Sequence, residues 1–100
     1  MIDKTTIYKY FIDTEHHIAG ISSTQYDIDM HEGAEILSVG LQCGRLCIWA
    51  RVNPNNPMET RHVFVVGTGW TVEDTVWTPD AKFIGTVFIG NGIFVYHIFA

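Results

Sequence analysis

The stretch VVGTGWTVEDTVW, residues 65–77, joins a β-branched run to a Gly-Thr-Gly turn, two tryptophans and an acidic pair. Such a turn can present backbone amides to a phosphate. However, neither the dinucleotide-binding G-x-G-x-x-G motif nor the Lys-Ser/Thr of a P-loop is present. Glycines also end strands where the chain bends sharply. We therefore predict a structural corner at Gly67–Gly69. The alternative is an anion site made of backbone amides, which Thr68 would border.

Histidine and aspartate form a second set of candidate chemical groups. The five histidines have neither zinc-finger nor H-E-x-x-H spacing. Asp27, Asp29 and His31 alternate along one predicted strand, so they share a face on which a divalent metal would need a further ligand. A solvated polar face explains the same alternation, and we predict neither a metal site nor a cofactor.

His97 interrupts an otherwise apolar segment near the end of the sequence. The predicted register of its hairpin places it near Thr86, which favours a histidine hydrogen-bonded across the sheet. The alternative is a general base or a contact to a ligand. A small hydrolase built on His97, or on the Asp27, Asp29 and His31 face, is thus the enzymatic alternative to a binding protein.

The large aromatic residues indicate a contact surface. Trp49 and Arg51 alternate on one face of a predicted hairpin, and aromatic and arginine residues dominate binding hot spots. Two further tryptophans flank an acidic segment in a predicted loop, where functional residues gather. The predicted ligand- or partner-binding residues are Trp49, Arg51, Trp70, Glu73, Asp74 and Trp77, with Thr68 and His97 as further candidate ligand contacts. The competing interpretation is that the Trp49 face packs under the loop that carries the other tryptophans.

Short segments rich in aromatic and β-branched residues must position these groups, and they predict antiparallel β structure. The expected strands are Thr6–Ile12, Gln25–Met30, Glu35–Gln42, Arg45–Asn53, Arg61–Val66, Phe83–Ile89 and Ile93–Phe99. With 100 residues, of which 47% are apolar, the chain is predicted to fold as one all-β domain over residues 1–100. We expect a single antiparallel β-sandwich or a partly open barrel built from hairpins, with about seven strands.

Two hairpins determine the expected registers. Cys43-Gly44 is read as a two-residue turn that pairs Gln42 with Arg45. The apolar face of that hairpin then consists of Leu37, Val39, Leu41, Leu46 and Ile48, with Leu37 opposite Ala50. Asn91-Gly92 is the strongest short hairpin signal in the chain. Both faces of its hairpin are largely apolar, so we expect it to lie centrally between two layers.

Charge and composition limit the partners and the compartment. Eleven acids against six scattered bases give a net charge of −5, so we expect no direct binding to DNA or RNA, whose phosphates need a field of Lys and Arg. No apolar stretch is long enough for a signal peptide or a membrane-spanning helix, and we expect a soluble cytoplasmic protein. Cys43 and Cys47 would lie about 13 Å apart on an extended strand, too far for a disulfide.

Several motifs occur in a characteristic order: IYKY, GAEILSVGLQCGRLCIWARVNP, VFVVGTG, FIGTV and GIFVYHIF. This order resembles a family of small uncharacterised proteins of tailed bacteriophages and prophages, a domain of unknown function, over nearly the whole chain. Members of that family often have His after Gly-Thr-Gly, where this chain has Trp70. The resemblance implies no catalytic residue. It implies an accessory phage protein in the cytoplasm of an infected bacterial host.

These features predict a non-enzymatic, phage-type accessory protein that binds and inhibits a bacterial defence or host component, as anti-CRISPR inhibitors do. The expected partner is a host or defence protein. An oligomeric sponge that sequesters a nucleotide immune signal is the alternative within this class. A minor virion or assembly protein and a small hydrolase are the alternatives outside it. Apolar strand faces that few loops can cover also favour a homo-oligomer.

Overall fold

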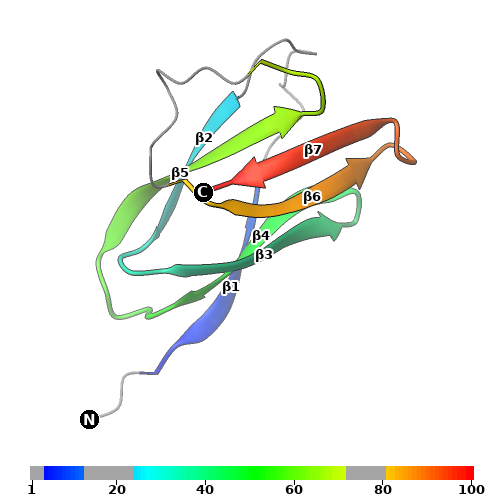
Figure 1. The fold of residues 1–100 in the computed structure, drawn as a ribbon. Helices are drawn as coiled ribbons and strands as arrows, with labels where there is room; N and C mark the ends of the chain where they lie inside the picture. Colours follow the sequence, from blue (N-terminus) through cyan, green and yellow to red (C-terminus); the bar gives the residue numbers. More distant parts are fainter. Residues whose placement is uncertain (1–3, 13–23, 72–80) are drawn as a thin grey trace.

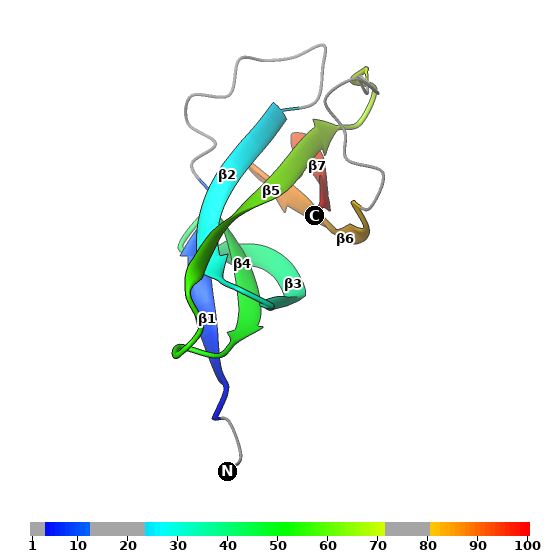
Figure 2. The same ribbon diagram turned by 90° about the vertical axis from the view of Figure 1, so that its left-hand side faces the viewer.

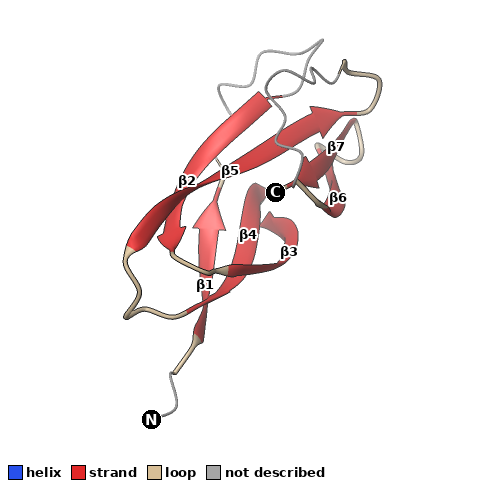
Figure 3. Cartoon of the chain, turned by 60° about the vertical axis from the view of Figure 1, so that its left-hand side comes forward, coloured by secondary structure: helices blue, strands red, loops and turns tan. Residues whose placement is uncertain are grey.

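The chain forms two antiparallel β-sheets (Figure 1). The structure is a computed structural model that describes residues 4–12, 24–71 and 81–100. Its strands are β1 (Thr6–Phe11), β2 (Thr24–His31), β3 (Glu35–Gln42), β4 (Arg45–Val52), β5 (Met58–Gly67), β6 (Phe83–Ile89) and β7 (Phe94–Phe99). Over the described residues there is no helix and no closed barrel (Figure 3). The predicted all-β class, with seven strands as a sandwich or open barrel, is confirmed.

In the sequence, the β3–β4 hairpin comes between β2 and β5, two strands that pair with each other in the other sheet. One sheet has the order β1-β4-β3 and the other β2-β5-β7-β6, and Figure 2 shows β1, β3 and β4 below the β2–β5 pair. The chain therefore leaves one sheet after β2 and returns to it before β5. Hydrogen bonds join these two crossings: Glu32 N donates to Pro57 O at 2.7 Å, and Asn56 Nδ2 donates to Glu32 O at 2.8 Å. His31 Nδ1 also lies 2.7 Å from Asn56 O, where only the ring nitrogen can donate.

The first hairpin turns where the sequence predicts. Cys43 and Gly44 have φ values of 52° and 74°, as the left-handed positions of a type I′ turn require. The predicted pairing is confirmed from Gln42 opposite Arg45 onward, through Val39. The two-residue turn thus determines the register of β3 against β4, the strand that carries Trp49.

The predicted position of Leu37 opposite Ala50 is wrong. A register shift at Leu37 puts Ile36 opposite Ala50, and the Leu37 side chain is 43% exposed. A β-bulge adds one residue to one strand, so the side chains beyond it exchange faces. Leu41, at the other end of β3, is also exposed, which leaves the predicted apolar face buried mainly on its β4 side.

The core lies between the two sheets. Its buried members are Ile12, Met30, Ala34, Leu46, Ile48, Ala50, Val52, Val63, Val65, Val87, Tyr96 and Ile98. Burial of Leu46 and Ile48 confirms their predicted place in it. The sheets approach closely where β3 passes β6, because a Cβ on Gly85 would lie 2.7 Å from Val39 Cγ1. Glycine at that position lets the two layers meet.

The second hairpin turns at Asn91-Gly92, which have φ values of 58° and 85°. His97 lies opposite Thr86, as predicted. The expectation that both faces of this hairpin are covered is wrong. Strand β7 lies between β5 and β6, but β6 is at the edge of its sheet, where Phe83 and Phe88 are 58% and 62% exposed.

Both cysteines are free, Cys43 exposed in its turn and Cys47 buried. Among the residues that the structure describes, none forms a helix long and apolar enough to cross a membrane.

We expect Ile48→Ala to lower the free energy of unfolding by about 2–5 kcal/mol, because this side chain is fully buried in β4 and its truncation leaves a cavity. Leu37→Ala is the control on the neighbouring strand. It should cost much less, because the bulge turns Leu37 toward solvent. Urea unfolding of both variants measures the difference, and equal losses would contradict this position of Leu37.

Candidate functional site

The side of the β1-β4-β3 sheet that faces away from the core brings together several predicted binding residues. Side chains directly opposite one another in a register share a face. The register gives this outer face as Ile7, Lys9, Phe11, Glu35, Ser38, Gly40, Gln42, Arg45, Cys47, Trp49 and Arg51. The predicted residues Trp49 and Arg51 therefore lie with side chains of β1 that the sequence analysis did not identify.

Two cations lie over the ring of Phe11 on this face. The Arg45 guanidinium carbon is 3.9 Å from the ring centroid, and Lys9 Nζ is 4.6 Å from it. Lys9 Nζ also donates a hydrogen bond to Gln42 Oε1 at 2.6 Å. A cation over an aromatic ring at these distances is attracted by the ring quadrupole. Phe11 thus holds two positive charges on a ring that is itself 39% exposed.

Trp49 covers the centre of the outer face. Its ring lies against Gly40, where a Cβ would come within 3.3 Å of Trp49 Cζ3. The indole is half-buried, while the neighbouring Cys47 is fully buried. The absence of a side chain at Gly40 provides the space for the indole. Trp49 therefore forms part of the surface and contributes exposed apolar area beside the cations.

The outer face has the opposite charge to the whole chain. Three bases and one acid, Glu35, give it a formal charge of +2, whereas the chain carries −5. On the β2-β5-β7-β6 sheet, the corresponding side of β2 carries Asp27 and Asp29, both exposed. The two outward sides of the sandwich thus differ in sign, and an acidic partner is favoured on only one of them.

Asp27 pairs with a histidine of the neighbouring strand. Asp27 Oδ1 lies 2.7 Å from His62 Nδ1 and accepts a hydrogen bond from Gln25 Nε2 at 2.9 Å. The Gln25 bond, and then the His62 bond, lower the pKa of Asp27 from its ordinary value of 3.8. Asp29 accepts a hydrogen bond from Thr60 Oγ1 at 3.0 Å. Across the described ranges, no three His, Cys, Asp or Glu side chains are arranged to hold a metal ion.

Both ring nitrogens of His97 contact threonine hydroxyls. Thr68 Oγ1 is 2.7 Å from Nε2, and Thr86 Oγ1 is 2.9 Å from Nδ1. A neutral imidazole donates from one nitrogen and accepts at the other, so either tautomer satisfies both threonines. The structure brings the two predicted ligand contacts, Thr68 and His97, together in a cross-strand hydrogen-bond network.

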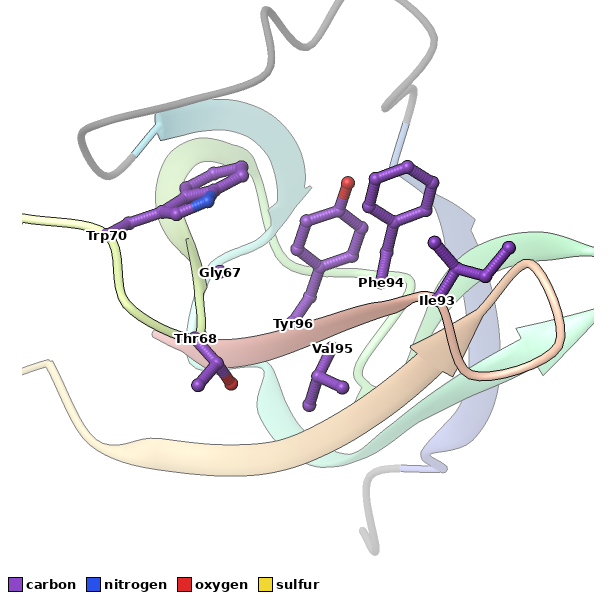
Figure 4. A pocket seen from close by; sticks show the side chains of 7 residues that line it. All are labelled: Gly67, Thr68, Trp70, Ile93, Phe94, Val95 and Tyr96. Carbon is purple, nitrogen blue, oxygen red and sulfur yellow. The ribbon is translucent and has the colours of Figure 1, made fainter.

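Trp70 packs against the core, and Figure 4 shows its indole beside Tyr96. Its backbone N donates to Gly67 O at 2.9 Å, and Gly69 has a φ of 86°, so residues 67–70 form a turn with glycine at its left-handed position. The indole then lies over Gly67 and makes an edge-to-face contact with Tyr96, with ring centroids 5.6 Å apart. The predicted corner is thus observed. Glu73, Asp74 and Trp77 lie outside the described residues.

The members of the outer face that sequence reasoning missed have a recognisable signal. In TIYKYF, the residues Ile7, Lys9 and Phe11 alternate with two tyrosines, and alternation places them on one side of β1. Nothing local indicates that β1 pairs with β4, because the two strands are far apart in sequence. Phe11 therefore becomes a neighbour of Arg45 only through the sheet topology.

The fold and these surfaces define a small all-β sandwich protein with one cationic, partly apolar outer face. Residues 3–100 match the family described as "Domain of unknown function (DUF7352)", and the chain belongs to that family. No curated protein and no solved structure matches the chain.

Gly67→Ala should displace the Trp70 indole, because the added Cβ would overlap the ring at Trp70 Cε2. We expect a loss of about 1–3 kcal/mol in unfolding free energy, as for other overpacked sites, and a red shift of tryptophan fluorescence. Gly40→Ala is the matched control, because its Cβ would lie 3.3 Å from the Trp49 ring and needs only a small adjustment. The packing of Trp70 on Gly67 is refuted if Gly67→Ala is the milder change.

The Asp27 pair predicts an acid-dependent loss of stability. A carboxyl with a lowered pKa stabilises the fold above its ordinary value of 3.8, and this stabilisation is lost as the pH falls through the lowered pKa. We therefore expect Asp27→Asn to be less stable than wild type at pH 6, with the difference closing under acid. Asp29→Asn removes the same charge without touching His62 and serves as the control. Urea unfolding from pH 6 to pH 2 measures the effect, and a constant difference would contradict it.

Proposed function

We propose that this protein is a non-enzymatic binding protein that recognises an acidic protein surface with its outer face. The observation that carries the proposal is the charge of that face, three bases to one acid on a chain of net charge −5. Ile7 and Phe11 expose apolar atoms among these charges, and such a mixture is typical of protein-binding surfaces. Carboxylates of the partner would meet Arg45 and Arg51, and complementary charge also speeds association.

A single-stranded nucleic acid is the rival partner for aromatic and cationic residues on a sheet. Its bases need open aromatic ring faces on which to stack. The Phe11 ring already carries the Arg45 and Lys9 cations, and the Trp49 ring lies against Gly40. A carboxylate can bind these cations where they are, whereas a base would have to displace them. This difference favours a protein partner.

The surroundings of His97 support the non-enzymatic part of the proposal. A histidine that acts as the base of a catalytic triad is oriented by a carboxylate, which also stabilises the imidazolium that forms. Here the groups at its two nitrogens are the hydroxyls of Thr68 and Thr86. They satisfy a neutral ring but supply no negative charge, which favours a structural role for His97 over hydrolysis.

The finer proposal is that the partner is a bacterial defence or host component, which the protein inhibits in the cytoplasm of an infected host. It is supported by the resemblance in motif order to small proteins of tailed bacteriophages. Membership of a family of unknown function adds no activity to this proposal. The nucleotide sponge, the virion assembly protein and the homo-oligomer stay predictions.

A pair of charge reversals tests the outer face. Arg51 and Lys82 are both exposed, and only Arg51 lies on that face. The partner is first captured from a bacterial lysate with the wild-type protein, identified by mass spectrometry and purified. We expect Arg51→Glu to weaken its binding about 30-fold or more, as loss of a hot-spot residue does. Lys82→Glu should leave the affinity within about 2-fold, as expected for a residue outside the interface.

Both variants change the net charge equally, so a general electrostatic effect would weaken binding in both. Equal losses, or no loss with Arg51→Glu, would therefore refute the outer face as the docking surface. Phe11→Ala is a further variant that removes the apolar ring without changing the charge, and it should also weaken binding.

A further inference from the structure

A notch lies where β5 turns away from β7. The two strands pair from Phe64 opposite Phe99 to Gly67 opposite Tyr96. The turn at residues 67–70 then directs the chain away from β7. Strand β7 continues to Phe94, beyond the last of these pairs. The space between the turn and the start of β7 has a volume of about 270 Å³. It is lined by residues of the turn and by the first residues of the β7 side of the hairpin (Figure 4).

Three aromatic rings give this notch a defined shape. The rings of Phe94 and Tyr96 are parallel to within 3°, with centroids 6.2 Å apart, and Trp70 meets Tyr96 at 67°. Figure 4 shows the three rings on one side of β7, while the side chains of Thr68 and Val95 point to the other side. Phe94 is 49% exposed, so its ring offers an open apolar face at the entrance.

Among the residues that the structure describes, those that line the notch carry no formal charge. Its residues are glycine, threonine, tryptophan, isoleucine, phenylalanine, valine and tyrosine, with no Asp, Glu, Lys or Arg among them. The Thr68 side chain points away from the three rings (Figure 4), and its hydroxyl contacts His97 Nε2 at 2.7 Å. A bound phosphate or carboxylate would find no cation among these described lining residues, and the chain's charge of −5 would repel it.

We propose that this notch binds a neutral nucleoside, with the base stacked against Phe94. Flat apolar ring faces select a planar aromatic group, because stacking maximises contact with little ordering of the protein. The volume of about 270 Å³ lies just below the range for drug-sized ligands, about 300–1,000 Å³, so it suits a small ligand such as one base with its sugar. The site is independent of the outer face and of the partner proposed above.

Calorimetric titration of the full chain with adenosine and uridine tests this site, with ribose as the ligand that lacks a base. We expect saturable binding of a nucleoside and none of ribose. Phe94→Ala should weaken that binding about 10-fold or more, as loss of one base-stacking ring does. Phe88→Ala is the matched control, because Phe88 is an exposed phenylalanine of the same hairpin that does not line the notch. It should leave the affinity unchanged.

Phosphate-bearing ligands separate a free nucleoside from a nucleic-acid strand. Adenosine 5′-monophosphate and a hexa-adenylate strand should bind no more tightly than adenosine, because the lining residues that the structure describes include no cation. Tighter binding of either phosphate-bearing ligand would overturn the proposal. It would also be overturned if neither nucleoside bound, or if Phe94→Ala bound the nucleoside as tightly as wild type does. Arg51→Glu should bind nucleosides as wild type does, so failure of this site and failure of the outer face are distinguishable.

Discussion

The hydrogen bonds between the two crossings, at Glu32 and at Asn56-Pro57, are the contacts on which the rest of the sandwich depends. They join the point where the chain leaves the β2-β5-β7-β6 sheet to the point where it returns. Because both crossings lie at one corner, the β3–β4 hairpin is held across the other sheet, and its apolar side closes the core. The opposite side of that hairpin must then face outward, whatever its composition. The cationic outer face is thus a consequence of this topology.

Alternation in β4 and β1 explains how an acidic protein can present a basic surface. The inward residues of β4, such as Ile48, are apolar, and the outward positions carry Arg45 and Arg51. Strand β1 adds Lys9 in the same way. Antiparallel pairing then brings charges that are scattered in the sequence onto one face of the sheet, because alternate residues of each strand point to the same side. The net charge of −5 therefore determines the electrostatic field far from the protein, whereas docking depends on the sign of the local charge on the face.

Much of the fold could be predicted because its turns carry strong local signals. Cys43-Gly44 and Asn91-Gly92 adopt the left-handed conformations that two-residue hairpins need, and each determines the pairing of a whole hairpin, including His97 with Thr86. The bulge at Leu37 could not be predicted, because a leucine there fits a regular strand equally well. The Phe11–Arg45 contact was also missed, since it depends on pairing between distant strands. Local chemistry predicted the strands and turns, and the site on the outer face required the topology.

The Gly67–Trp70 turn shows how a short motif can form an aromatic notch. Gly67 has no side chain, so Trp70 can fold back over its own strand and contact Tyr96. Two bonds of Thr68 hold the turn in place, its N–H to Val95 O at 3.0 Å and its hydroxyl to His97. The turn is therefore joined to β7 through both the backbone and the side chain of Thr68. A surface held in this way loses little entropy when a ligand binds. The threonine and histidine that resemble catalytic groups thus hold in place the turn that forms one wall of the aromatic notch.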